Sequence, residues 1–102
     1  MNPLIESHRS ELEQFCKRFR VKRLDLFGSA ATGDFKSEAS DLDFLVEFQP
    51  LRPNERADAY FGLLFALEDL FQYKIDLVES EAVQNPYFLR SANQSRTLLY
   101  AA

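Results

Sequence analysis

The chain has 102 residues, of which 46% are hydrophobic, and a formal net charge of −4. This length predicts a single domain over residues 1–102 that is large enough to bury a core. The acidic balance argues against direct binding to nucleic acid or to an anionic membrane surface. A single cysteine, a polar amino terminus and the lack of a membrane-length apolar run favour a cytoplasmic protein without an internal disulfide.

The first half of the chain is expected to form one helix and two strands. Apolar residues recur at three- and four-residue spacing over Leu4–Phe19, which predicts an amphipathic helix. A strand follows over Val21–Phe27. The stretch Ser29–Gly33 is suited to a short helical turn, because serine is a good N-cap residue. A polar loop then leads into a second strand over Asp41–Phe48.

The second half predicts a long helix, a short strand and a final helix. Helical spacing of apolar residues covers Asn54–Phe71, and a third strand is expected over Lys74–Glu79. Pro86 is suited to the first position of a last helix that runs toward Tyr100. We therefore expect an α/β (α+β) fold, with a small mixed sheet of three or more strands and helices covering one face.

The most informative pattern is Gly28-Ser29, then eleven residues, then Asp41-Leu42-Asp43. Side chains alternate along a strand, so Asp41 and Asp43 are expected to point to the same side. Neighbouring carboxylates repel each other unless a cation lies between them, and hard oxygen ligands suit Mg²⁺. The glycine–serine turn offers phosphates close backbone approach, N–H donors and a hydroxyl. Together these residues predict a nucleotide–metal site.

The segment Leu26–Gly33, followed by Ser40–Phe48, resembles the signature of the polymerase-beta nucleotidyltransferase superfamily. More narrowly, it resembles the minimal nucleotidyltransferases (MNT). The run Ile75–Val78 is similar to the strand that carries the third carboxylate of that superfamily. Minimal nucleotidyltransferases are typically MntA-like antitoxins whose partners are helical HEPN ribonuclease toxins. The resemblance implies a polymerase-beta-like nucleotidyltransferase fold.

The resemblance also implies an activity: metal-dependent transfer of AMP from ATP to a tyrosine of a HEPN toxin, which neutralises the toxin within a hetero-oligomer. Two metal ions can stabilise the attacking and leaving oxygens of an in-line displacement at the α-phosphate. On this hypothesis Asp41 and Asp43 hold two Mg²⁺ ions, and Asp76 completes the ligand set and helps to align or deprotonate the acceptor. Gly28 and Ser29 contact the β- and γ-phosphates.

Other residues leave alternatives open. Many relatives carry a basic residue after the serine where this chain has Ala30–Thr32, so phosphate charge is left to the metals or to another cation. The basic cluster Lys17–Arg23 is interpreted either as favourable charge at a helix C-terminus or as a contact for triphosphate or an acidic partner. His8 is expected to be structural or partner-facing, and Cys16 to be a small core residue. Some aromatic residues from Tyr60 onward are expected to form an exposed patch for a partner.

Three rival functions use the same fold. The first is an antitoxin that blocks its toxin by binding alone, the second an enzyme that modifies a small molecule, and the third a domain that only senses nucleotides. Replacing Asp41 and Asp43 by Ala separates catalysis from occlusion, because occlusion should survive loss of the metal ligands. Drug-modifying relatives generally carry an additional helical domain, so the chain as given favours a protein acceptor.

Overall fold

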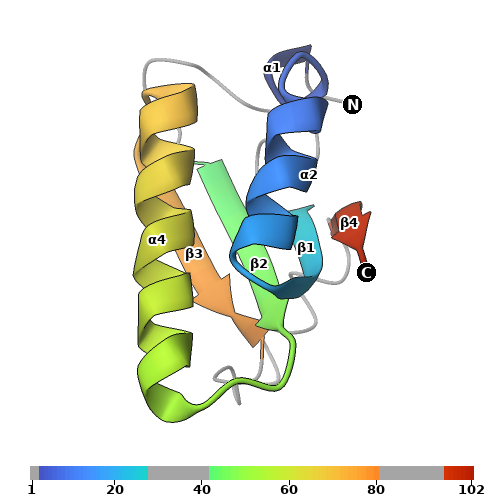
Figure 1. The fold of residues 1–102 in the computed structure, drawn as a ribbon. Coiled ribbons are helices and arrows are strands. Elements are labelled where there is room, and N and C mark those ends of the chain that lie inside the picture. The colour runs from blue at the N-terminus through green and yellow to red at the C-terminus, as the bar shows by residue number, and fades with distance from the viewer. Residues whose placement is uncertain (1–2, 28–41, 81–95) are drawn as a thin grey trace, which may run out of the picture.

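A four-stranded mixed sheet packs against two helices in the computed structural model, which describes residues 3–27, 42–80 and 96–102 (Figure 1). The spatial order of the strands is β3-β2-β1-β4. β1 pairs antiparallel with both β2 and β4, and β2 pairs parallel with β3. The strands are β1 (Val21–Phe27), β2 (Leu42–Phe48), β3 (Ile75–Glu79) and β4 (Thr97–Ala101), and the helices are α1 (Pro3–Glu6), α2 (Arg9–Arg18) and α4 (Pro53–Phe71).

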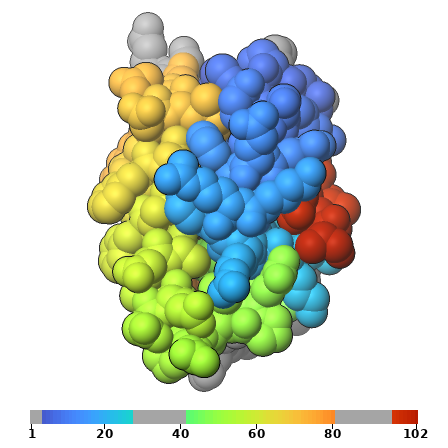
Figure 2. Space-filling view, in the orientation of Figure 1, coloured from blue at the N-terminus to red at the C-terminus, as the bar shows by residue number. Residues whose placement is uncertain are grey.

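Helices α2 and α4 lie side by side over one face of the sheet (Figures 1 and 2). The predicted fold class, a small mixed sheet with helices on one face, is confirmed. Among the described residues, none of the helices is both long enough and apolar enough to cross a membrane.

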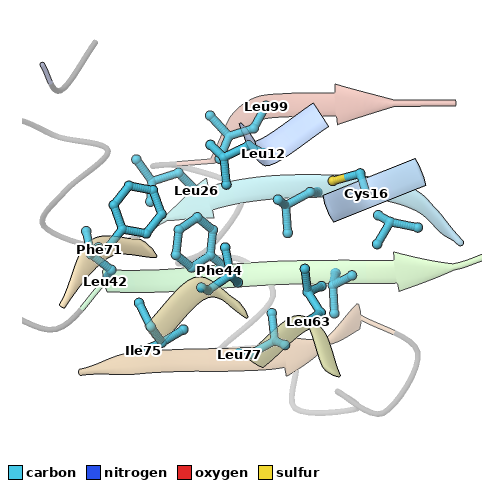
Figure 3. Packing of buried hydrophobic residues seen from close by; sticks show 14 of the residues in the cluster. Leu12, Cys16, Leu26, Leu42, Phe44, Leu63, Phe71, Ile75, Leu77 and Leu99 are labelled. Atoms are coloured by element: carbon cyan, nitrogen blue, oxygen red, sulfur yellow. The ribbon is translucent and has the colours of Figure 1, made fainter. Parts of the chain in front are cut away.

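The core lies between the helices and the inner face of the sheet (Figure 3). Side chains alternate along β2, so its even-numbered residues point toward the helices and its odd-numbered residues point away from them. Every even-numbered position of β2 is apolar and buried, as the sequence pattern predicts. The central contributors to this core are Leu24, Leu26, Leu42, Phe44, Val46, Phe48, Leu63, Leu67, Phe71, Ile75 and Leu77.

Local sequence signals fix both ends of α4. Pro53 occupies the start of the helix, where its missing N–H costs no hydrogen bond. The Glu55 side chain accepts a hydrogen bond from the Arg52 backbone N–H at 3.2 Å, which satisfies a donor before the first turn. The helix ends at Gln72, whose backbone adopts the left-handed conformation (φ 57°, ψ 32°). The predicted helix over Asn54–Phe71 is therefore confirmed to within one residue.

Gly62 of α4 lies against the ring of Phe19, the residue that ends α2, and this contact yields a test of packing. A Cβ at position 62 would lie 2.5 Å from Cε1 of Phe19. We expect Gly62→Ala to lower the free energy of unfolding by about 1–3 kcal/mol, the usual cost of overpacking. In a Phe19→Ala background, Gly62→Ala should instead raise the free energy of unfolding by up to about 1 kcal/mol, because alanine is a better helix former than glycine. Urea unfolding of the four variants measures both effects, and equal effects in the two backgrounds would contradict the contact.

Two predictions about helices are wrong. The predicted continuous helix over Leu4–Phe19 is divided into α1 and α2 by a turn. There the Ser7 hydroxyl donates a hydrogen bond to the Leu4 carbonyl at 3.0 Å, and His8 leaves the helical conformation (φ −118°, ψ 19°). Serine side chains compete with the backbone for such carbonyls, which favours turns over helix interiors.

The predicted last helix does not reach Tyr100, because residues Thr97–Ala101 form strand β4. The expected helix start at Pro86 lies outside the described residues, as does the expected turn over Ser29–Gly33. β4 covers the free edge of β1, with Tyr100 opposite Leu24. Leu99 is buried in the core and Tyr100 packs against the same core, while Leu98 is exposed.

Candidate functional site

Two of the predicted site carboxylates, Asp43 and Asp76, are neighbours on the outer face of the sheet. The parallel register of β2 and β3 places Asp43 opposite Asp76. Neighbouring strands lie about 4.8 Å apart, and paired residues direct their side chains to the same face. Asp43 is half-buried and Asp76 is exposed. The two carboxylates are thus held side by side, where one cation can contact both.

The end of strand β1 lies directly beside this pair. Phe27, the last residue of β1, pairs with Asp43, and Gly28 follows it in the sequence. Residues Gly28, Ser29 and Asp41 lie outside the described residues, so their predicted roles stay predictions. The described part of the chain brings together Asp43, Asp76 and the end of β1.

A small apolar cluster supports the carboxylates from the same face of the sheet. Phe27 and Leu45 are buried, and Val78 packs against them. Leu45 lies two residues after Asp43 on β2 and opposite Val78 on β3. Apolar neighbours lower the local dielectric constant, which strengthens the attraction between a carboxylate and a cation. The cluster also fixes the strands that carry the two acids.

A third acid on this face, Asp25, was not among the predicted site residues. Its side chain is 0% exposed and lies on β1 opposite Leu45. The Arg23 Nε donates to its Oδ2 at 3.0 Å, and the Arg96 Nη2 lies 2.7 Å from the same oxygen. Two cations already neutralise this carboxylate, so its role is to anchor the beginning of β4 to β1 rather than to hold a metal ion. The available signal in the sequence was a charge inside the apolar run of β1, with an arginine two residues earlier on the same face.

Tyr60 joins helix α4 to the strand that carries Asp76. Its hydroxyl donates a hydrogen bond to the Leu77 carbonyl at 2.6 Å. Burial of the ring, and then the negative charges of Asp76 and Glu79, raise the pKa of Tyr60 above its ordinary value. The phenol therefore stays protonated at neutral pH and keeps its role as a donor. This bond holds β3 against the helix layer.

The described acids supply only part of a metal site. Within residues 3–27, 42–80 and 96–102, no three His, Cys, Asp or Glu side chains gather closely enough to hold a metal ion. Asp43 and Asp76 offer two carboxylates, and the adjacent predicted ligand, Asp41, lies outside these ranges. Mg²⁺ is commonly bound by one or two carboxylates together with substrate phosphates. The chemistry of the two described donors fits such an ion.

Most cations of the basic cluster Lys17–Arg23 have acidic partners in the structure. Lys17 and Arg18 lie in the last turn of α2, where positive charge is favourable. The other three cations have acidic partners: Arg20 contacts Glu55 at 3.1 Å, Lys22 contacts Glu47 at 3.6 Å, and Arg23 contacts Asp25. A surface hollow of about 310 Å³ is lined by residues from the end of α2 and the start of α4, including Arg18 and Asp58. That hollow lies at the opposite end of β2 from Asp43.

His8, in the turn between α1 and α2, and Cys16 of α2 have structural roles, one of the possibilities expected for His8 and the role expected for Cys16. His8 Nδ1 lies 2.9 Å from Glu11 Oε2, and its ring packs edge-on against Phe71 at 5.4 Å. Cys16 is fully buried in the core. Both positions agree with their interpretation as packing residues.

Burial makes the Cys16 thiol unreactive, and this is directly measurable. Desolvation, with a smaller contribution from the charge of Glu13, raises the pKa of Cys16 to about 12. At pH 8 we expect reaction with an aromatic disulfide reagent to be at least about 100-fold slower in native protein than in urea, because the thiolate is the nucleophile. Above pH 9 the thiol is ionised in unfolded protein, where its pKa is 9.0, but is still protonated in folded protein. The contribution of Cys16 to the free energy of unfolding should therefore fall as the pH rises from 9 toward 12. Equal rates in native and unfolded protein would contradict the burial.

Paired carboxylates on neighbouring strands, beside the end of a strand that leads into a Gly-Ser pair, are typical of enzymes that transfer phosphoryl or nucleotidyl groups. The family described as "Nucleotidyltransferase domain" matches residues 9–99. The chain belongs to this family, and it is a nucleotidyltransferase. The resemblance to minimal nucleotidyltransferases is confirmed.

Individual relatives agree with this assignment. "Putative protein adenylyltransferase MJ1379" of Methanocaldococcus jannaschii is 31% identical over 91 residues, which cover 89% of this chain and 86% of the relative. A solved structure described as a "putative minimal nucleotidyltransferase" is 26% identical, with a TM-score of 0.68 and coverage of 91% and 90% of the two chains.

Two structures of toxin–antitoxin complexes share the fold at lower identity. A toxin–antitoxin with AMP-PNP matches with a TM-score of 0.71 at 18% identity, over 92% of this chain and 73% of that one. A complex of tri-AMPylated Shewanella oneidensis HEPN toxin with MNT antitoxin matches with a TM-score of 0.60 at 16% identity, over 95% and 72% of the chains. At these identities the likeness establishes a shared fold.

Proposed function

We propose that this chain is a metal-dependent protein adenylyltransferase that transfers AMP from ATP to a tyrosine of a HEPN ribonuclease toxin and so neutralises the toxin. The observation that carries the proposal is the register that sets Asp43 opposite Asp76 beside the end of β1. Further support comes from the 31% identical relative, whose name is "Putative protein adenylyltransferase MJ1379", and from structural neighbours described as an AMPylated HEPN toxin complex and an AMP-PNP complex.

The reaction forms one bond and breaks one. The acceptor tyrosine oxygen attacks the α-phosphorus of ATP, the bond from that phosphorus to the bridging oxygen breaks, and pyrophosphate leaves. Asp43, together with Asp41, would hold two Mg²⁺ ions. When bound, these ions stabilise the negative charge that develops on the attacking and leaving oxygens. Asp76 would orient the acceptor hydroxyl and accept its proton.

The remaining contacts follow the predicted motif. Gly28 would allow close backbone approach to the β- and γ-phosphates, and Ser29 would donate its hydroxyl and N–H to them. The partner would contribute the surface around its own tyrosine, so the complete site exists only in the hetero-oligomer. Asp76 is exposed on the outermost of the described strands, which agrees with an acceptor that comes from outside the chain.

The experiment is intact-mass measurement of a HEPN-class partner after co-expression with this chain. We compare the wild type with Asp41→Ala/Asp43→Ala and with Glu47→Gln. The last is a matched control, because Glu47 lies on the same strand and the same face as Asp43 but pairs with Lys22. The expected result is a partner heavier by one or more AMP groups with the wild type and with Glu47→Gln, and an unmodified partner with the double variant. An unmodified partner bound tightly by all three would contradict transfer and favour neutralisation by binding alone.

A further inference from the structure

The outer face of α4 carries two large exposed aromatic side chains. Phe61 is 51% exposed and Phe65 is 61% exposed. Residues four apart lie on the same side of a helix, and the two rings are 6.2 Å apart. Tyr60 packs edge-on against Phe61 at 5.1 Å, which extends the aromatic surface toward the sheet. Ala57 is exposed one helical turn before Phe61. We call the surface formed by Ala57, Phe61 and Phe65 the aromatic stripe, after its two phenylalanines.

The stripe is additional to the face of α4 that fills the core. That inner face is provided by Ala59, Leu63, Leu67 and Phe71. Between Ala57 and Leu67 the helix has one charged side chain, Asp58. A helix on the surface of a domain normally has a polar outer face, whereas a helix that is apolar all round is normally buried. α4 is thus suited to being covered on both sides.

From Ala57 onward, the charged side chains of α4 itself have one sign. Arg56, one residue earlier, is paired with Glu79 at 3.0 Å, and Arg18 of α2 lines the same hollow as Asp58. Residues 57–72 contain Asp58, Glu68 and Asp69 but no Lys or Arg. A complementary surface would therefore have apolar side chains at its centre and basic side chains around them. A second copy of this chain fits poorly, because a two-fold contact with antiparallel helices would bring Asp58 of one copy toward Asp69 of the other. Charge complementarity favours a different protein.

The stripe also adjoins the strand that carries Asp76. Tyr60, beside Phe61, bonds to the carbonyl of Leu77, the residue after Asp76. Among the described strands β3 lies at the edge of the sheet, and Figure 1 shows α4 running alongside it at one side of the molecule. A protein seated on the stripe would lie next to the sheet edge that presents Asp76. Such a partner can extend a side chain around that edge to the candidate site.

We propose that the outer face of α4, centred on Phe61 and Phe65, is the docking surface for the protein acceptor, which meets it with aliphatic side chains rimmed by Lys or Arg. This inference rests on the proposed function in one respect, namely that the acceptor is a protein. It adds where that protein binds and which chemistry recognises it.

The test measures binding separately from transfer. The affinity of purified chain for a HEPN-class partner is compared between wild type and Phe61→Ser/Phe65→Ser. The matched control is Leu98→Ser, which removes an exposed apolar side chain (47% exposed) from β4 instead. Loss of two central aromatic contacts is expected to weaken binding by about 100-fold or more, while Leu98→Ser changes it by less than about threefold. Asp69→Lys is expected to slow association by about tenfold through charge repulsion.

Each outcome decides something. Affinity unchanged in Phe61→Ser/Phe65→Ser, with unfolding and MgATP binding like the wild type, overturns the docking surface. The docking surface is also overturned if the wild type binds no HEPN-class partner. It is overturned as well if the wild type forms a homodimer that Phe61→Ser/Phe65→Ser dissociates. Binding that depends on both phenylalanines without any mass gain on the partner would support the docking surface while refuting the proposed transfer. The two proposals therefore fail separately.

Discussion

Replacing Asp43 by Asn is expected to slow AMP transfer by about 1000-fold or more, with little change in the free energy of unfolding. The substitution keeps the shape of the side chain but removes the charge that faces Asp76 across the β2–β3 pair. Stabilisation of the transition state by a bound metal ion amounts to several kcal/mol, and each 1.36 kcal/mol changes the rate about tenfold. Initial rates with α-labelled ATP, partner protein and saturating Mg²⁺ measure the effect.

The comparison variants assign this effect to the site. Asp76→Asn should reduce the rate by about 100-fold, as expected when a general base or an aligning group is lost. Glu47→Gln, on the same face of β2, should retain nearly the full rate because Glu47 pairs with Lys22 away from Asp43. If Asp43→Asn retained more than about a tenth of the wild-type rate, Asp43 would not be an essential ligand.

Those parts of the fold that depend on local periodicity could be predicted from the sequence. The alternation of β2 identified its buried face, and the apolar spacing over Asn54–Phe71 identified α4. The neighbouring positions of Asp43 and Asp76 followed from recognising the third strand of the family pattern, and the register confirms that they lie together. Gly28, Ser29 and Asp41 lie outside the described residues and stay predictions.

The parts that could not be predicted depend on contacts between distant segments. Five residues of β4 are too few to show a clear period, and their strand conformation comes from pairing with β1, where Leu98 lies opposite Asp25. The role of Asp25 depends on Arg96, which is near the other end of the chain. The break between α1 and α2 depends on a single hydroxyl at Ser7. Hydrophobic patterning carries no information on any of these three features.

Replacing Arg96 by Ala is expected to lower the free energy of unfolding by about 3–5 kcal/mol, because it leaves a fully buried carboxylate without its closest cation. Arg23 also contacts Asp25, but its side chain is 44% exposed, so solvent screens its charge and it compensates only in part. Urea unfolding measures the loss. Lys22→Ala, which removes the cation of an exposed ion pair on the same strand, should cost less than about 1 kcal/mol.

A double variant separates the cost of the unpaired charge from the value of the pair itself. Asp25→Leu/Arg96→Met replaces both partners by apolar side chains, and such replacements of buried pairs are often neutral or stabilising. We therefore expect it to recover most of the stability that Arg96→Ala loses. If the double variant were as unstable as Arg96→Ala, the pair would hold β4 on β1 by its own attraction. If the double variant recovers stability, apolar contacts such as those of Leu99 are sufficient to hold β4 on β1. The main role of Arg96 would then be to neutralise the charge of buried Asp25 beside the candidate site.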